Sequence, residues 1–132
     1  MIIDTFIDVR GEAMGKTYAW IWIENIYTRK RKRLKLLVDT GATFTWIKRE
    51  TLEELGIEPV RKERFELING EIIERDVGEA RVIYRDITGL TMVVFAEKDD
   101  KEVLGLMALE SLGLYVHPST GKLMREKALL AF

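Results

Sequence analysis

The residue with the clearest chemical potential is an aspartate at the end of an apolar run. Residues 36–43 read LLVDTGAT, and Asp39 follows LKLLV, whose apolar residues are interrupted only by Lys35. Aspartates in ordinary hairpin turns usually lie among polar residues. Gly41, two positions later, permits a tight turn and a close approach of backbone. The pattern therefore predicts that the Asp39 carboxylate lies at the end of a buried strand.

Other candidate chemistry is weaker. The chain has no cysteine, which excludes disulfides, thiolate metal sites and cysteine nucleophiles and favours a reducing compartment. His117, the only histidine, is expected in a turn beside Pro118 without supporting ligands, so we assign it no role and expect neither a metal nor a cofactor. Residues 11–17, GEAMGKT, resemble a phosphate-binding loop, but the glycine spacing is one residue short and a strand pattern follows where a helix is required.

An aromatic stripe alternates along residues 17–27, TYAWIWIENIY. Tyr18, Trp20 and Trp22 point one way along the expected strand, and Ala19, Ile21 and Ile23 point the other way. Because both faces are apolar, we expect the strand to be covered on both sides. Core packing is the favoured interpretation of the aromatic stripe, and a subunit or ligand surface is the alternative.

Five consecutive basic residues, Arg29 to Arg33, separate two expected strands. A solvated hairpin tip whose charges discourage aggregation is favoured over a phosphate-binding segment. The net charge of the whole chain is −1, with 33% charged residues, so we expect neither nucleic acid nor a membrane as a partner. Charged residues interrupt the apolar N-terminal pattern, which fits neither a signal peptide nor a membrane span, and we expect a cytoplasmic protein.

The remaining chain predicts further short elements. Residues 43–47 read as a strand and residues 48–56 as a short helix that ends near Gly56. Asn69-Gly70 between alternating segments predicts a hairpin with a type I′ turn, which needs positive φ at both positions. Another strand, and then a short strand followed by a helix, are expected over 89–116. The sequence predicts one mainly β domain, residues 1–132, with eight or more strands and two short helices.

Four segments together carry a family resemblance: VDTGAT, RETLEELG, VLGLMALESLGL and VHPSTGKL. In their order and approximate spacing the chain resembles the retropepsin-like aspartic proteases, especially the small single-domain prokaryotic members. The resemblance spans residues 34–124. It implies an all-β fold with two short helices, a retropepsin-like closed acid-protease barrel with one lobe in each chain.

Aspartic proteolysis needs two carboxylates that share one proton, one to draw a proton from water and one to polarise the peptide carbonyl. This chain has a single Asp-Thr-Gly. A two-fold axis would bring Asp39 of each subunit to one point. The resemblance likewise implies an obligate homodimer whose active site lies on the symmetry axis and cleaves extended or unfolded polypeptides.

The resemblance also implies roles for single residues. Asp39 would be catalytic, Thr40 would hydrogen-bond across the axis, and Gly41 would offer its amide to the carboxylate. The other expected contacts are substrate-binding: Ala42 beside the catalytic water, a flap at Ile68, Asn69 and Gly70, and the strand residues Leu104 and Gly105. Gly105 is expected where two backbones nearly touch.

Three features depart from the family pattern. Met107 stands where many relatives carry a polar residue, Glu71 near the flap would disfavour acidic substrates, and residues 127–132, KALLAF, show no counterpart of the viral interface strands. A catalytically weak or inactive dimerisation or peptide-binding module is therefore the alternative function, since one scaffold can serve both purposes.

Overall fold

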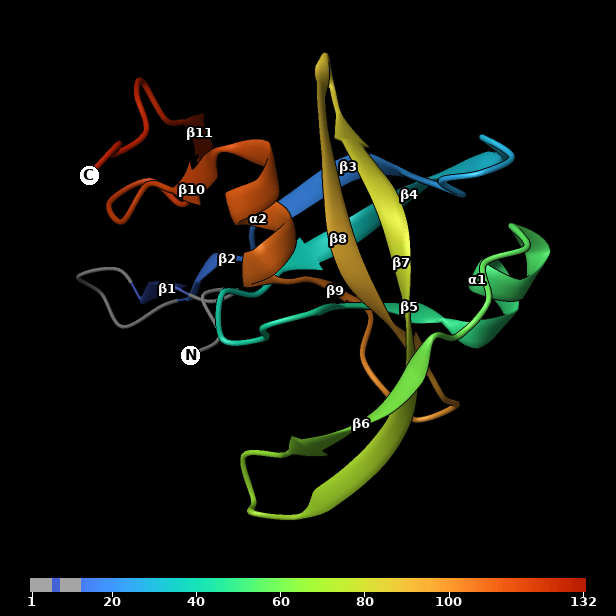
Figure 1. Ribbon diagram of the computed structural model, residues 1–132. Coiled ribbons are helices and arrows are strands. Elements are labelled where there is room, and N and C mark those ends of the chain that lie inside the picture. Colours follow the sequence, from blue (N-terminus) through green and yellow to red (C-terminus); the bar gives the residue numbers. More distant parts are fainter. Residues whose placement is uncertain (1–5, 8–12) are drawn as a thin grey trace.

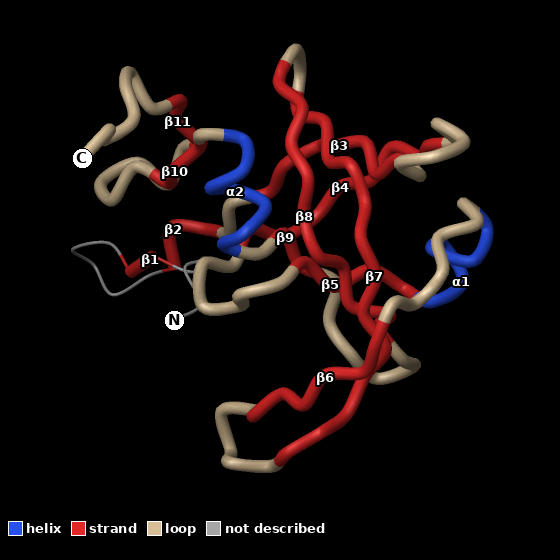
Figure 2. The backbone as a smooth tube through the Cα atoms, viewed as in Figure 1, coloured by secondary structure: helices blue, strands red, loops and turns tan. Residues whose placement is uncertain are grey.

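The chain forms short strands around a closed core with two short helices at its sides, as seen in a computed structural model that describes residues 6–7 and 13–132 (Figures 1 and 2). The strands are β1 (Phe6–Ile7), β2 (Ala13–Gly15), β3 (Tyr18–Glu24), β4 (Arg31–Val38), β5 (Thr45–Lys48), β6 (Arg61–Glu66), β7 (Ile72–Tyr84), β8 (Ile87–Ala96), β9 (Val103–Leu104), β10 (Leu114–Val116) and β11 (Leu123–Arg125). The helices are α1 (Arg49–Glu54) and α2 (Leu106–Leu112). This mainly β composition with two short helices confirms the predicted fold class.

The main sheet closes into a barrel. Its strand order is β3-β4-β9-β5-β8-β7-β6, and β3 also pairs with β7. Strands β3, β4, β9, β5, β8 and β7 therefore form a ring, and β6 continues outward from β7. Closure pairs β3 with β7, so β3 is not left as the free edge that it would form in an open sheet. The closed barrel expected from the family resemblance is present.

Strand β7 belongs to two structures at once. Its first half, Ile72–Val77, pairs antiparallel with β6, and its second half pairs with β3 through Arg81, Val82 and Ile83. Gly78 lies just after the last residue paired with β6, and a Cβ there would approach the Glu58 carbonyl oxygen to 2.9 Å. The same strand thus builds the projecting β6–β7 hairpin and one wall of the barrel (Figure 1).

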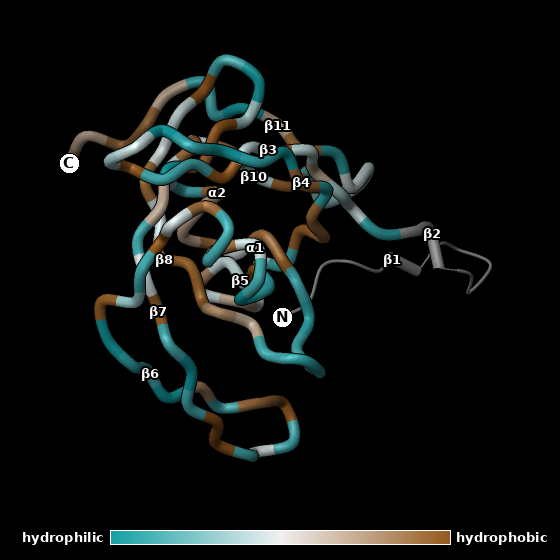
Figure 3. The backbone as a smooth tube through the Cα atoms, turned by 90° about the vertical axis from the view of Figure 1, so that its right-hand side faces the viewer, coloured by the Kyte–Doolittle hydropathy of each residue, from teal (hydrophilic) through white to brown (hydrophobic). Residues whose placement is uncertain are grey.

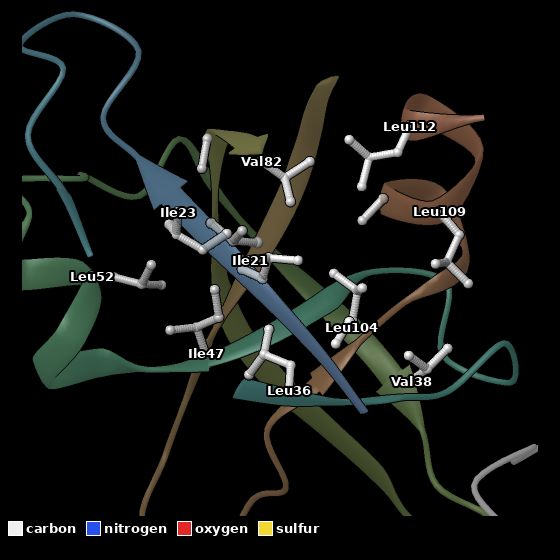
Figure 4. Packing of buried hydrophobic residues seen from close by; sticks show 14 of the residues in the cluster. Ile21, Ile23, Leu36, Val38, Ile47, Leu52, Val82, Leu104, Leu109 and Leu112 are labelled. Atoms are coloured by element: carbon white, nitrogen blue, oxygen red, sulfur yellow. The ribbon is translucent and has the colours of Figure 1, made fainter. Parts of the chain in front are cut away.

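Branched apolar side chains fill the barrel. Every second residue of β3 and β4 points inward, and these residues meet side chains from β5, β7, β9 and both helices (Figure 4). The fully or nearly fully buried members include Ile21, Ile23, Leu36, Val38, Ile47, Leu52, Val82, Leu104, Leu109 and Leu112. Burial of each such side chain contributes roughly 1.5–3 kcal/mol. The strand that ends at Asp39 is therefore anchored by its own inward row.

The predicted helices are present, and glycine follows each of them. Gly56 has φ 71 just after α1, and Gly113 has φ 67 as the residue that ends α2. Both values lie in the left-handed region that glycine adopts without a steric cost. Neither helix in the described part of the chain is long and apolar enough to cross a membrane.

The aromatic stripe of β3 does not pack in the core. Ala19, Ile21 and Ile23 are buried, whereas Tyr18 is 49% and Trp20 50% exposed. The expectations that both faces are covered and that the stripe packs in the core are therefore wrong. The basic run also departs from a simple hairpin tip, because Arg31 and Arg33 lie within β4 and stack over the rings.

Candidate active site

Asp39 directly follows β4, and two hydrogen bonds of its backbone groups fix its position. The Asp39 amide donates a hydrogen bond of 2.9 Å to the Leu104 carbonyl, and the Asp39 carbonyl accepts one of 3.2 Å from the Ala42 amide. Only 7% of the residue is exposed. The chain therefore turns sharply after the strand. The prediction that a carboxylate lies at the end of a buried strand is confirmed.

The three residues after Asp39 complete a tight loop. The Gly41 amide donates a hydrogen bond of 2.8 Å to Asp39 Oδ1, which is the contact that the resemblance implied for this glycine. Thr40 and Ala42 are half-buried and Gly41 is exposed. One carboxylate oxygen of Asp39 is thereby oriented, while the loop that carries it stays accessible from outside the chain.

Strand β9 passes beside the Asp39 loop. It pairs parallel with the end of β4, Leu37 with Val103 and Val38 with Leu104, and antiparallel with β5. A Cβ at Gly105 would lie 2.3 Å from the Phe44 carbonyl oxygen and 2.8 Å from that of Ala42. The close approach of two backbones expected at Gly105 is present, and only glycine fits there.

Thr45 ties the same two segments together. Its hydroxyl accepts a hydrogen bond of 3.0 Å from the Gly105 amide, and the residue is fully buried. Leu104 is also fully buried, within the hydrophobic core. Thr45 was not predicted as a site residue because nothing in the sequence around it indicates a partner 60 positions away. Leu104 and Gly105 present no side chain to a ligand, so any contact with a peptide would involve their backbone.

The predicted flap residues lie at the tip of the β6–β7 hairpin. The Gly70 amide donates to the Leu67 carbonyl, the Leu67 amide donates to the Glu71 carbonyl, and Gly70 has φ 87. Asn69 does not have positive φ, so the hairpin is present but the type I′ turn is wrong. The loop has three residues, and the left-handed glycine forms its bulge. Asn69 instead accepts the Glu71 amide through Oδ1 at 2.9 Å.

The hairpin tip is exposed and carries apolar side chains on both sides of its polar turn. Ile68 is 93% and Ile72 46% exposed, and the hydrophobic stretches that flank the turn are visible at the lower end of Figure 3. Exposed apolar side chains on a projecting hairpin are suited to covering a bound chain. Backbone groups at such an edge can also pair with an extended peptide.

An aromatic cluster joins the outer end of the hairpin, close to its tip, to the segment that follows the Asp39 loop. The Phe65 ring on β6 meets the Phe44 ring at 5.9 Å and the Trp46 ring at 5.0 Å, both edge to face. Such pairs stabilise by about 0.5–1.5 kcal/mol beyond area burial. This cluster is not predicted from the sequence, although Phe44 and Trp46 share one face of the expected strand 43–47.

Ion pairs fix the hairpin base to α1 and to β8. Arg49 Nη2 lies 2.7 Å from Asp76 Oδ2 and 2.9 Å from Glu97 Oε2, and Lys62 Nζ lies 3.0 Å from Asp76 Oδ1. Hydrogen bonds from Arg49 and then Lys62 hold the pKa of Asp76 below its ordinary value. Glu97 and then Asp76 raise the pKa of Arg49. Asp76 and Arg49 therefore stay ionised at neutral pH.

A second pair fixes the outer part of β7. The Arg75 guanidinium donates to both carboxylate oxygens of Asp100, at 2.7 and 2.9 Å, and Asp100 Oδ2 also accepts the Glu97 amide at 2.7 Å. The hydrogen bonds from Arg75 hold the pKa of Asp100 below its ordinary value. This two-pronged geometry is the strong form of an arginine–carboxylate pair.

The remaining sequence candidates do not join this site. His117 lies in the turn between β10 and β11, where its Nδ1 accepts the Ser119 amide at 3.2 Å. The GEAMGKT segment lies partly outside the described residues, and its end forms β2 and leads into β3, with no helix. Within residues 6–7 and 13–132, no three His, Cys, Asp or Glu side chains gather as a metal site would require.

Residues 28–111 match the model of a protein family described as "gag-polyprotein putative aspartyl protease". This span covers more than half of the chain and includes the Asp39 loop, the β6–β7 hairpin and β9. The chain therefore belongs to this family of retroviral-type aspartyl proteases, as the sequence resemblance indicated. No individual curated protein matches the chain significantly.

Proposed function

We propose that the protein is a homodimeric aspartic endopeptidase in which the two Asp39 carboxylates activate one water molecule. The observation that carries the proposal is Asp39 itself, a nearly buried aspartate at a strand end with Oδ1 bound by the Gly41 amide. Two such groups a few ångströms apart share a proton, because both cannot ionise readily. The charged carboxylate takes a proton from water, and the protonated one polarises the peptide carbonyl.

The need for a second copy follows from the sequence, since the chain has only one Asp-Thr-Gly. Accessible Thr40 and Gly41 leave the Asp39 loop open to a symmetric neighbour. The C-terminal segment supports pairing, because Leu129, Leu130 and Phe132 are largely or fully exposed in the single chain. A second subunit would remove such side chains from water.

The substrate is proposed to be an extended or unfolded polypeptide held under the two β6–β7 hairpins. Ile68, Asn69 and Gly70 would close over it and exclude water, while backbone groups of the hairpin pair with the peptide. Thr40 would hydrogen-bond to the partner's loop, and Ala42 would leave room for the attacking water. Leu104 and Gly105 would position Asp39 from behind.

Cleavage of a denatured protein by wild type and by Asp39→Asn tests the proposal across acid to neutral pH and at raised temperature. We expect products from wild type, inhibition by hydroxyl-containing transition-state mimics, and no products from Asp39→Asn. Asp99→Asn removes an exposed carboxylate that has no salt bridge among the described residues and should keep full activity. Hydrolysis retained in Asp39→Asn would refute the mechanism. Peptide binding without products in either protein would instead establish a binding module.

A further inference from the structure

The outer face of β3 and β4 carries two parallel rows of side chains. Tyr18, Trp20 and Trp22 form the aromatic row on β3, and Arg31, Arg33 and Lys35 form the cationic row on β4. We call these six residues the cationic–aromatic face. Strands β3 and β4 lie on the side of the barrel away from the tip of the β6–β7 hairpin (Figures 1 and 3).

Each cation of this face lies over one ring. The Arg31 guanidinium is 4.6 Å from the Trp22 ring, that of Arg33 is 4.4 Å from the Trp20 ring, and Lys35 Nζ is 5.0 Å from the Tyr18 ring. The strands pair Trp22 with Arg33 and Trp20 with Lys35, so every cation leans diagonally to its ring. This packing orders the long side chains while both rows stay in contact with solvent.

A hollow of about 390 Å³ lies beside these rows. Its lining combines the three rings of β3 with Arg33 and with Tyr84 and Arg85 from the β7–β8 turn. The Arg85 guanidinium lies 5.1 Å from the Tyr84 ring, which repeats the same pairing where the end of β7 adjoins β3. The hollow therefore has planar rings and guanidinium groups on two sides.

The charge of this surface is locally positive although the chain as a whole is not. Among the described residues, no salt bridge neutralises Arg31, Arg33, Lys35 or Arg85. The acid nearest to this face on β3, Glu24, is already bound by Arg81 at 2.9 Å. Asp86, next to Arg85, is the one acid in the adjoining turn. Four cations at this surface thus lack an acidic partner among the described residues.

We propose that the cationic–aromatic face binds single-stranded nucleic acid. Alternate residues of a strand lie roughly 6.6–6.8 Å apart, so the half-exposed rings of Tyr18 and Trp20, together with the guanidinium planes that stack on the tryptophans, offer successive stacking positions for unpaired bases. The guanidinium groups and Lys35 complement the phosphates that connect those bases. A duplex would hide its bases, and an acidic peptide would use the cations but leave the row of rings without a role. The proposal replaces the expectation, drawn from net charge, that nucleic acid is not a partner.

Fluorescence anisotropy with a labelled oligouridylate of about 12 nucleotides tests the proposal. We expect saturable binding that weakens with salt, with a slope of log affinity against log salt of up to about −3 for four phosphates. A duplex of the same length should bind more weakly, and polyglutamate should compete poorly. Absence of binding at low salt, equal binding of the duplex, or equal competition by polyglutamate would each overturn the proposal.

Matched variants locate the binding. Trp20→Ala should weaken binding about fivefold or more because a stacking platform is lost, whereas Trp20→Phe keeps a ring and most of the affinity. Arg33→Glu should weaken binding and reduce the salt slope, whereas Lys98→Glu makes the same charge change on an exposed loop elsewhere and should match wild type apart from a small general charge effect. Thermal unfolding followed by circular dichroism checks that each variant is folded. Affinity unchanged in folded Trp20→Ala and Arg33→Glu would exclude this face.

Discussion

The Thr45 hydroxyl holds the Gly105 amide, 60 positions further along the chain, in a fully buried hydrogen bond of 3.0 Å. Gly105 in turn lies against the carbonyls of Ala42 and Phe44, which belong to the segment after Asp39. At the scale of single residues, therefore, the position of the proposed catalytic carboxylate depends on groups that do no chemistry themselves.

Replacement of Thr45 tests this dependence. Thr45→Val keeps the shape but leaves the Gly105 amide without an acceptor, which should lower the free energy of unfolding by about 1–3 kcal/mol. Thr45→Ser retains the hydroxyl and should lose less. Urea unfolding of the two variants gives both values. A larger loss in Thr45→Ser than in Thr45→Val would mean that the methyl group, and not the hydrogen bond, matters at this position.

Gly105→Ala should be costly for a different reason. The added Cβ would overlap backbone atoms of Phe44 and Ala42, which cannot rotate away. We expect a loss of about 3 kcal/mol, the upper end for overpacked sites. Gly113→Ala is the control, because a Cβ there meets nothing within 4 Å and only its φ of 67 is unfavourable. That variant should lose about 1 kcal/mol. Similar losses in both variants would contradict the close-approach argument.

At the scale of elements, the β6–β7 hairpin is held along its strands and free at the loop of its tip. The Arg75–Asp100 pair fixes β7 on the barrel side, and Phe65, near the outer end of β6, packs on Phe44 and Trp46. The tip, by contrast, has only its own turn hydrogen bonds among the described residues. This division suits an arm that moves at its end while its root stays in register.

The Arg75–Asp100 pair predicts a specific pH dependence. The pKa of Asp100 is lowered in the folded chain, so the pair contributes its full stability above the ordinary carboxyl value of about 3.9 and loses it as pH falls through the lowered value. Asp100→Asn should therefore cost about 1–3 kcal/mol at neutral pH, and the cost should shrink below about pH 4. Urea unfolding across pH measures the difference, with Asp99→Asn as control. A cost that is independent of pH would exclude the ionic contribution.

Local patterns predicted most elements but not how they meet. Asn69-Gly70 predicted the hairpin, and Gly56 predicted the end of α1. The apolar run before Asp39 predicted the buried strand. The type I′ turn failed because Asn-Gly also suits a three-residue loop in which only Gly70 needs positive φ. The side to which Trp20 points could not be decided locally, since both faces of β3 are apolar and its cationic neighbours come from β4. The Phe44–Phe65 contact likewise joins segments that are remote in sequence.

At the scale of the whole molecule, the proposed enzyme exists only as a pair. Mixing wild type with Asp39→Asn at equal amounts and constant total protein tests this directly. With free exchange of subunits, roughly a quarter of the dimers would carry two Asp39 residues, and activity per wild-type chain would fall by about half. A single chain that acted alone would keep its activity per wild-type chain unchanged, and that outcome would exclude the shared site.

Because β7 forms part of both the β6–β7 hairpin and the barrel wall, insertions should be tolerated at some of its positions and not at others. Side chains alternate between the two faces of a strand, so one residue inserted between Val77 and Tyr84 would turn inward-facing positions such as Ala80 and Val82 toward the outside. An insertion at residues 67–71 would merely lengthen a loop. Among related chains, insertions and deletions should therefore occur mainly at the hairpin tip. The number of residues from Gly78 to the β7–β8 turn should remain constant.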